Sequence, residues 1–184
     1  MPITPEHAAQ VRAEADCLYD REQVGAAVDR MATEITARIG GRNPLVLCVM
    51  NGALMVTAEL LVRLDFPLEL DYLHATRYRG ETSGGALHWF REPSVPLEGR
   101  VVLVVDDILD EGPTLAAIRE YCAAQGAAEV LAAVLVDKVH DRRAPGAFAE
   151  FIGIQAPDRY LFGYGMDYKE YLRNAPGIFA VRGM

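Results

Sequence analysis

The chain has 184 residues, of which 51% are hydrophobic and 24% charged, and its formal net charge is −8. This length supports a single domain with a sizeable core and is too short for two full-sized domains. The negative charge repels a phosphate backbone, which argues against general nucleic-acid binding and favours small ligands that arrive with a metal ion. No apolar run approaches membrane-spanning length and the first ten residues lack a leader pattern, so we expect a cytoplasmic protein without a membrane partner.

The predicted elements alternate between helix and strand. Asp20 and Gln23 form a capping signature, and apolar residues then recur at helical spacing as far as Ile39, so residues 1–40 are expected to form an N-terminal helical segment. Short apolar runs indicate buried strands at 44–50, 68–76, 100–105 and 130–136, and helical patterns cover 53–64 and 113–125. A polar, glycine-bearing stretch at 77–85 predicts a mobile loop. The alternation predicts an α/β fold with a mostly parallel sheet covered by helices.

The third predicted strand runs directly into acidic residues. Asp106 and Asp107 follow it, and the turn after them leads through Asp110 and Gly112 into a helix with proline at its first position. Parallel sheets bind ligands at the carboxyl ends of their strands, so these carboxylates are expected to face a ligand crevice. A glycine turn that opens a helix presents backbone N–H groups to a phosphate, and Thr114 adds a hydroxyl donor. Acids beside an anion site need a divalent cation between them, and Mg²⁺ prefers oxygen ligands.

Two other interpretations of this turn fit the sequence less well. A receiver domain also ends a strand in two aspartates, but there the pair follows the first strand, whereas here about a hundred residues precede it. A merely structural strand end does not explain why acids, glycine and threonine converge on one turn. The three cysteines have no metal-ligand spacing and are expected to be buried, reduced thiols: Cys17, Cys48 and Cys122. The four histidines share no ligand spacing and are expected on the surface or in the core.

The stretch VVLVVDDILDEGPTL resembles the phosphoribosyl pyrophosphate-binding motif of type I phosphoribosyltransferases. The segments VDK at 136–138 and PDRYLFGYGMDYKEYLR at 157–173 resemble the hypoxanthine-guanine phosphoribosyltransferases in order and spacing. The resemblance implies a single type I phosphoribosyltransferase domain over residues 1–184, with a flexible active-site loop at 77–90 and a purine-binding hood at 156–184. It also implies transfer of the 5-phosphoribosyl group to N9 of a 6-oxopurine, hypoxanthine or guanine, with release of pyrophosphate.

The resemblance assigns roles to individual residues. Asp110 matches the proposed general base, and Asp106 and Asp107 match the acidic pair that holds the ribose hydroxyls directly or through Mg²⁺. Lys138 matches the lysine that donates to the purine 6-oxygen, and Asp167 matches both a residue near the purine and a second magnesium ligand. The further implied contacts with phosphoribosyl pyrophosphate are Asn51, Gly52, Glu111, Gly112, Pro113, Thr114 and Arg173, and those with the purine are Tyr160 and Leu161.

The sequence departs from the family pattern at three places. Asn51 stands where the family usually has a lysine after the first strand, which implies weaker pyrophosphate binding. Glu111 replaces a residue that normally bonds the phosphate, and its side chain is expected to point outward. In the predicted loop, Tyr78 matches a family tyrosine, while Arg77 and Arg79 are expected to return positive charge when the loop closes over substrate.

Several alternatives stay open at this level. A regulator that senses phosphoribosyl pyrophosphate has the same fold, although Asp110, Lys138 and Asp167 favour an enzyme. The sequence does not decide among hypoxanthine, guanine and xanthine. Glu170 lies three residues before Arg173, so an ion pair between them is an alternative role for that arginine. The family implies a homodimer or a homotetramer.

Overall fold

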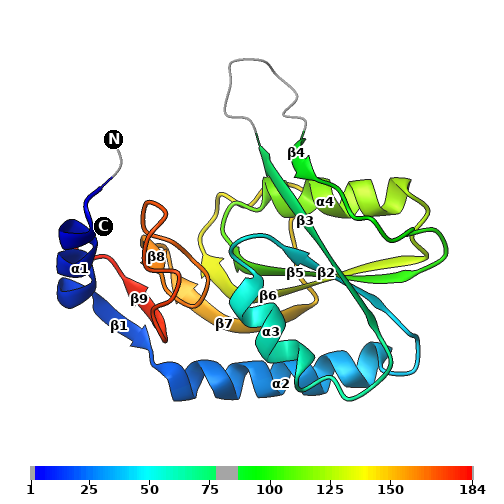
Figure 1. Cartoon of the computed structure of the whole chain (residues 1–184), viewed down its shortest axis with the longest axis horizontal. Coiled ribbons are helices and arrows are strands. Elements are labelled where there is room, and N and C mark those ends of the chain that lie inside the picture. The colour runs from blue at the N-terminus through cyan, green and yellow to red at the C-terminus, as the bar shows by residue number, and fades with distance from the viewer. Residues whose placement is uncertain (1–2, 78–86, 184) are drawn as a thin grey trace.

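The computed structural model describes residues 3–77 and 87–183, and its centre is a six-stranded sheet (Figure 1). The strand order is β4-β3-β2-β5-β6-β7, and all neighbouring pairs are parallel except β3 with β4. The strands are β2 (Leu45–Val49), β3 (Glu69–Arg77), β4 (Leu87–Arg91), β5 (Val101–Leu109), β6 (Glu129–Val139) and β7 (Phe151–Pro157). The predicted α/β fold with a mostly parallel sheet is confirmed.

Helices cover both faces of this sheet. The chain passes from β2 to β3 through α3 (Leu54–Leu61) and from β5 to β6 through α4 (Pro113–Ala124). These two connections leave the sheet centre in opposite directions, and because such crossovers are right-handed, α3 and α4 lie on opposite faces. The long helix α2 (Arg21–Ile39) packs beside α3 and against β7 (Figure 1). It begins at the predicted capping box of Asp20 and Gln23.

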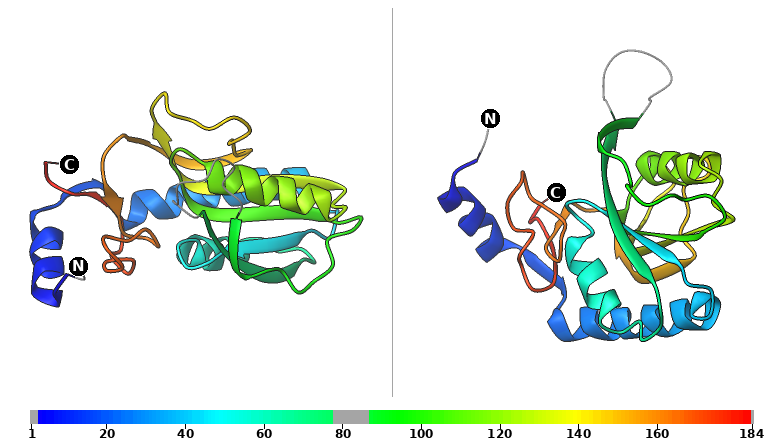
Figure 2. Two further views of the ribbon diagram at one scale, coloured as in Figure 1. Left: turned by 90° about the horizontal axis from the view of Figure 1, so that it is seen from above. Right: turned by 45° about the vertical axis from the view of Figure 1, so that its right-hand side comes forward.

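A second, smaller sheet joins the two ends of the chain. It has the order β1-β9-β8, with bounds Asp16–Tyr19, Ile178–Ala180 and Leu161–Phe162, and α1 (Pro5–Glu14) lies beside it (Figure 2). Its own apolar cluster centres on Phe162 and Phe179. Residues 1–40 are therefore not wholly helical as expected, because β1 interrupts them and pairs with the C-terminal strand β9. Cys17 lies on β1 and is exposed, which corrects the expectation of three buried thiols.

The outer edge of β7 carries carbonyl groups that no further strand pairs with. Side chains from the first part of the chain bind them instead: the Tyr19 hydroxyl donates to the Gln155 carbonyl at 2.8 Å, and Arg30 donates to the carbonyls of Ile152 and Gly153. The edge strand is thus capped by polar side chains, which is one way in which proteins block edge-to-edge pairing.

Strand lengths differ from the sequence-based expectation in one informative way. Strand β5 was expected to end at Val105 and β6 at Val136, but they continue to Leu109 and Val139. Both extensions carry polar residues. The pairing of β5 with β6 continues to Leu109 and Asp137, and Lys138 and Val139 pair with β7. The expected flexible loop at 77–90 is shorter at its far end, because 87–90 belong to β4, and residues 78–86 lie outside the described part. No helix within 3–77 and 87–183 is both long and apolar enough to span a bilayer.

Candidate active site

The candidate site lies between β2 and β5, where the connections leave the sheet in opposite directions. Open α/β sheets bind ligands at this point, outside the carboxyl ends of the strands. A cavity of about 740 Å³ opens here, and its walls come from the turn after β2, the end of β5, the first turn of α4 and the segment before β9. The chain buries few charged residues among those described, and two of them, Asp107 and Lys138, belong to this region. Burying a charge is costly, so their position here indicates a function rather than packing.

Asp106 and Asp107 lie on the part of β5 that extends beyond β2. Strand β2 pairs with β5 only as far as Val105, so both carboxylates come after the last paired residue. Burial and the neighbouring Asp107 raise the pKa of Asp106 well above its usual value, and burial raises the pKa of Asp107 as well. Neither aspartate takes part in an ion pair with a described residue. The charge of Arg173 lowers the pKa of Asp107 in part, but burial outweighs it, so the pair offers two carboxylates that no ion pair with a described residue neutralises.

Two glycines allow the backbone to approach these acids closely. A Cβ atom at Gly52 would clash with the carboxylate of Asp107, and one at Gly165 would clash with the carbonyl oxygen of Gly52. The segment before β9 is thus packed directly on the turn after β2. The Met50–Asn51 peptide bond in that turn is cis, and Asn51 is exposed and lines the cavity. Asn51 and Gly52 both line the main cavity, and their contact with the substrate stays a prediction.

The turn from Glu111 to Thr114 has the features of an anion site. Helix α4 begins at Pro113 as predicted, and Gly112 has φ 78°, a left-handed conformation that favours glycine. A Cβ atom at Gly112 would also clash with Leu109 and Ala147, so glycine is required for two reasons. Glu111, Gly112, Pro113 and Thr114 all line the main cavity, and a helix that begins at such a turn can bind a phosphate through its first N–H groups. The Glu111 side chain is exposed, as expected, and lies 3.6 Å from Arg142.

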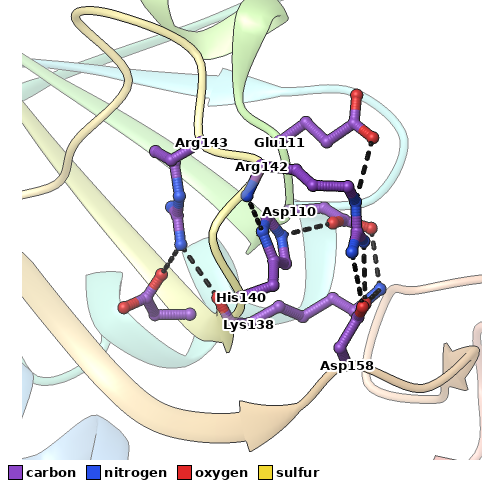
Figure 3. A network of polar contacts seen from close by, with 8 residues as sticks. Asp110, Glu111, Lys138, His140, Arg142, Arg143 and Asp158 are labelled. Atoms are coloured by element: carbon purple, nitrogen blue, oxygen red, sulfur yellow. Dashed lines mark hydrogen bonds and ion pairs between the residues drawn. The ribbon is translucent and has the colours of Figure 1, made fainter.

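Asp110 is held by two polar side chains on its neighbouring strand and loop (Figure 3). Its Oδ2 accepts a hydrogen bond from Lys138 Nζ at 2.8 Å, and its Oδ1 lies 2.8 Å from His140 Nε2. Burial raises the pKa of Asp110, but the hydrogen bond and charge of Lys138, with a smaller contribution from His140, outweigh it and hold the pKa below its usual value. Asp110 is therefore ionised at neutral pH, as a general base must be.

Lys138 is shared between two carboxylates. Its Nζ also lies 3.3 Å from Asp158, and Arg142 forms a two-pronged pair with Asp158 at 2.7 and 3.0 Å (Figure 3). The Lys138 side chain is only 9% exposed, so its ammonium group is held in place rather than solvated. Lys138 is therefore not an ordinary surface lysine, in agreement with the sequence analysis.

A second, smaller pocket adjoins the main cavity. Its volume is about 190 Å³, and it is lined by Lys138 and Tyr160 together with Asp107, Ile108, Asp110, Leu161, Met166 and Asp167. Asp110 and Asp167 also line the main cavity, so the two spaces share a wall. Tyr160 is 41% exposed, whereas Tyr168, which meets it edge to face, is buried. An exposed aromatic ring beside a buried ammonium group suits a flat, polar ring.

Arg173 is oriented by the acidic residues of its own segment. Its Nη2 lies 2.8 Å from Asp167 Oδ1 and 3.5 Å from Glu170, while Nη1 donates to the carbonyl of Gly165 at 2.8 Å. The pair with Glu170 that the sequence allowed does form, but the contact with Asp167 is shorter. Arg173 nevertheless lines the main cavity. It is the only arginine or lysine among the described residues that line this cavity, so an anionic ligand would meet it first.

The metal site expected at Asp106, Asp107 and Asp167 is only partly assembled. All three residues line the main cavity, and their carboxylate oxygens suit Mg²⁺. Within the described part of the chain, the residues whose ligand atoms all lie within 4.8 Å of one another are a different set: Asp110, His140 and Asp158. The ammonium group of Lys138 contacts both of these carboxylates, so a protein cation already neutralises that cluster.

Some predicted residues remain untested by the structure, and others were missed. Tyr78 and Arg79 lie outside the described residues, and Arg77 is the last residue of β3. The sequence did not single out His140, Asp158 or Arg142. The rule that found Asp106, which looks for polar residues after a buried strand, also applies to His140, because it directly follows β6 beside β5.

The fold and the site define a class of protein. A parallel sheet with an acidic pair, an adjoining anion turn at the switch point and a small covering sheet is the arrangement of a phosphoribosyltransferase. A family model described as a phosphoribosyl transferase domain matches residues 14–169.

Individual relatives narrow this class. The hypoxanthine-guanine-xanthine phosphoribosyltransferase of Tritrichomonas foetus is 33% identical over 161 residues, which cover 88% of each chain. The hypoxanthine-guanine phosphoribosyltransferase of Bacillus subtilis is 33% identical over 162 residues, which cover 88% of this chain and 89% of that one. The solved hypoxanthine phosphoribosyltransferase of Trypanosoma cruzi, in complex with the product IMP, has a TM-score of 0.85 at 28% identity and covers 92% of this chain and 96% of its own. This chain belongs to the hypoxanthine-guanine phosphoribosyltransferase family.

Proposed function

We propose that this protein transfers the 5-phosphoribosyl group from phosphoribosyl pyrophosphate to N9 of a 6-oxopurine, giving IMP or GMP and pyrophosphate in purine salvage. The observation that carries this proposal is the pair of adjoining spaces with Asp110 in their shared wall. The larger space has an anion turn and an acidic pair for the sugar phosphate. The smaller one has an aromatic ring and a buried lysine for the base.

The reaction exchanges one bond at C1 of the ribose for another. The bond from C1 to the pyrophosphate oxygen breaks, the bond from C1 to N9 forms, and the proton of the purine ring nitrogen passes to Asp110. The ionised state of Asp110 and its position between the two spaces support this role. A positioned general base contributes roughly 10²- to 10⁴-fold in rate.

Substrate contacts follow from the two spaces. The turn of Glu111, Gly112, Pro113 and Thr114 receives the 5′-phosphate, and Asp106 and Asp107 receive the ribose hydroxyls. Arg173 and the turn at Asn51 and Gly52 face the pyrophosphate. Lys138 donates to the 6-oxygen, Tyr160 stacks on the ring, and Leu161 and Asp167 border its edge.

Mg²⁺ is the proposed cofactor. The acidic pair with raised pKa values supports it, because a cation bound with the substrate would offset the repulsion between these groups. Asp106 and Asp107 would hold it beside the ribose hydroxyls, and Asp167 would be a second magnesium ligand. When bound, Mg²⁺ neutralises the pyrophosphate as it leaves.

The proposal extends to the whole chain as one domain, in which 156–184 serve as the hood over the purine. We keep the cytoplasm as its location and a homodimer or homotetramer as its state. The exposed apolar side chains of Leu54, Leu70 and Tyr72, which border a mostly apolar hollow of about 460 Å³, support self-association.

A pyrophosphate-release assay with hypoxanthine, guanine, xanthine, adenine and uracil tests the function. Release is expected with hypoxanthine or guanine and not with adenine or uracil, because an ammonium donor suits a 6-oxo group. Release with none of the five bases, although phosphoribosyl pyrophosphate and Mg²⁺ are present, would contradict the proposal. Xanthine is a second candidate substrate because the relative from Tritrichomonas foetus is named for it.

A further inference from the structure

His140 makes two specific contacts in a nearly closed setting. Its Nε2 lies 2.8 Å from Asp110 Oδ1, and its Nδ1 accepts a hydrogen bond from the Arg142 backbone N–H at 3.1 Å. The His140 side chain is only 3% exposed, so water does not compete for either nitrogen. The ring is thus fixed at both nitrogens, as Figure 3 shows.

These contacts decide which ring nitrogen carries the proton. Nδ1 faces a backbone N–H, which can only donate, so Nδ1 must offer its lone pair. The ring is therefore neutral with its proton on Nε2, and that proton points at the Asp110 carboxylate. The backbone of the loop after β6 selects the form of histidine that donates to Asp110.

We infer that His140 is a positioning residue for the general base: it holds the Asp110 carboxylate in place when Lys138 turns to the purine. This inference rests on the proposed function. In the free protein, Lys138 and His140 each bind one oxygen of Asp110. A purine that accepts from Lys138 competes for the ammonium donors, whereas His140 lies on the other oxygen and keeps its contact.

The neighbouring ion pairs give Lys138 and His140, the two partners of Asp110, different roles. Asp158 lies 3.3 Å from Lys138 and is itself gripped by Arg142, so Lys138 keeps one carboxylate partner when it binds the purine. Among the described residues, Lys138 is the only lysine or arginine that forms an ion pair with Asp110. When Lys138 binds the purine, His140 is the remaining donor to Asp110. Without His140, Asp110 would be free to rotate at the moment when the purine proton must reach it.

Two other roles for His140 fit the geometry less well. A metal ion held by Asp110, His140 and Asp158 would have to displace the Lys138 ammonium group that contacts both carboxylates. A proton relay from Asp110 would need a free lone pair on Nε2, but Nε2 already carries the proton. His140 therefore does not take the purine proton from Asp110.

The test compares His140→Phe, which fills the space without a donor, with His140→Gln, whose amide can donate from a similar position. His140→Phe is expected to lower kcat about 10- to 100-fold, the scale of an ångström of misplacement in an active site. The KM for phosphoribosyl pyrophosphate should change little. His140→Gln should recover most of kcat, and Asp141→Ala, at the exposed neighbour on the same loop, should match the parent.

A second comparison separates positioning from a structural role. The same His140→Phe change is made in an Asp110→Asn background. If His140 acts through Asp110, it should cost little there, because the group that it positions no longer takes the proton. An equal loss in both backgrounds would overturn the inference. Equal kcat of His140→Phe and the parent would do so too, whereas a parent inactive with every 6-oxopurine would instead contradict the proposed function.

A spectroscopic measurement on the unchanged protein covers the case in which His140→Phe does not fold. The ¹⁵N chemical shifts of the His140 ring, assigned by their absence in His140→Gln, should show a neutral ring with its proton on Nε2 at pH 7. They should shift when Asp110→Asn removes the negative acceptor. A ring protonated on Nδ1, or a spectrum that Asp110→Asn leaves unchanged, would show that the contact with Asp110 is not made in solution.

Discussion

The two acidic groups of the site are built on opposite principles. Asp110 and Asp158 are neutralised by cations of the protein, Lys138 and Arg142, and the pKa values of both carboxylates are lowered. Asp106 and Asp107 lie on β5, which ends just before Asp110, yet no described lysine or arginine forms an ion pair with them and their pKa values are raised. Asp110 and Asp158 have their ion-pair partners in the free protein, whereas Asp106 and Asp107 are expected to gain a partner when substrate and metal bind.

This difference indicates a separation of tasks. A base must be ionised and oriented before the purine arrives, which the paired group provides. A site for a metal-bound sugar gains affinity if its charges are unpaired beforehand, because binding then relieves their repulsion. The same sheet edge thus carries a preorganised part and a part that the substrate organises.

The largest expected effect comes from the base itself. Asp110→Asn keeps the shape and most hydrogen bonds but cannot accept the proton, so kcat should fall about 10²- to 10⁴-fold. Steady-state kinetics with hypoxanthine or guanine measure this. If Asp110→Asn were as active as the parent, Asp110 would not be the general base, and the proposed division of tasks between the two acidic groups would be wrong.

Lys138→Gln should have the next largest effect. The amide still donates a hydrogen bond but lacks charge, and the KM for the purine should rise about 10- to 100-fold because a charged hydrogen bond in a buried site is lost. Lys169→Gln, at the other lysine of the chain, is the control and should leave KM unchanged. If the KM for phosphoribosyl pyrophosphate rose instead, Lys138 would bind that substrate and not the purine.

Asp106→Asn should stabilise the free protein, because it removes one of two repelling buried charges. The free energy of unfolding in urea at pH 7, without Mg²⁺, should rise by on the order of 1 kcal/mol. In the parent, a raised folded-state pKa means that the folded state takes up protons first, so stability should grow as the pH falls from the folded-state pKa to the unfolded-state pKa. In Asp106→Asn, the unfolding free energy should rise much less as the pH falls.

For Asp110, which is paired with Lys138, the pH dependence of stability is expected to have the opposite sign. The lowered pKa of Asp110 contributes stability that is present above the unfolded-state pKa and is lost as the pH falls through the folded-state value. Asp65→Asn, at an exposed aspartate far along the chain from both groups, serves as a control for the unfolding measurements. If Asp106→Asn lowers the unfolding free energy as Asp110→Asn is expected to do, the two groups do not differ.

The smallest effect is expected at the periphery of the paired group. Arg142→Ala removes the grip on Asp158 but leaves the backbone N–H that binds His140, so it tests the ion pair alone. Exposed ion pairs contribute about 0.2–1 kcal/mol, so the KM for the purine should rise no more than about fivefold. The difference should shrink as salt is added, and a loss that salt does not reduce would point to misfolding of the loop.

Much of the fold and of the proposed site could be predicted from the sequence. Buried strands in parallel sheets are continuous apolar runs, and Pro113 after a glycine turn marks a helix start, so β2, β5, β6 and α4 were found in place. The strand ends were placed too early because Asp106 and Lys138 are polar, and apolar patterning cannot follow a strand into a binding site. The strands β1, β8 and β9 have two to four residues, which is too short for a periodic signal.

The cluster around Asp110 shows what sequence patterns leave out. Lys138 was found through a short motif, but His140 has no partner at a ligand spacing, and Asp158 and Arg142 look like ordinary surface charges. Their roles arise because the loop after β6 folds back on β5: the Ala144 N–H binds the Glu111 carbonyl at 2.8 Å, and Ala147 packs beneath Gly112. Such a three-dimensional contact leaves no repeat or spacing in the chain.

The capped edge of β7 has a consequence for how the molecule can assemble. Because Tyr19 and Arg30 occupy its carbonyls, another molecule cannot extend the large sheet there without first displacing them. Tyr19 belongs to β1, which pairs with β9, so one residue links the border of the large sheet to the small sheet. Displacement of the small sheet would remove Tyr19 from the Gln155 carbonyl and leave this acceptor open to a strand of another molecule, whereas Arg30, on α2, would stay in place.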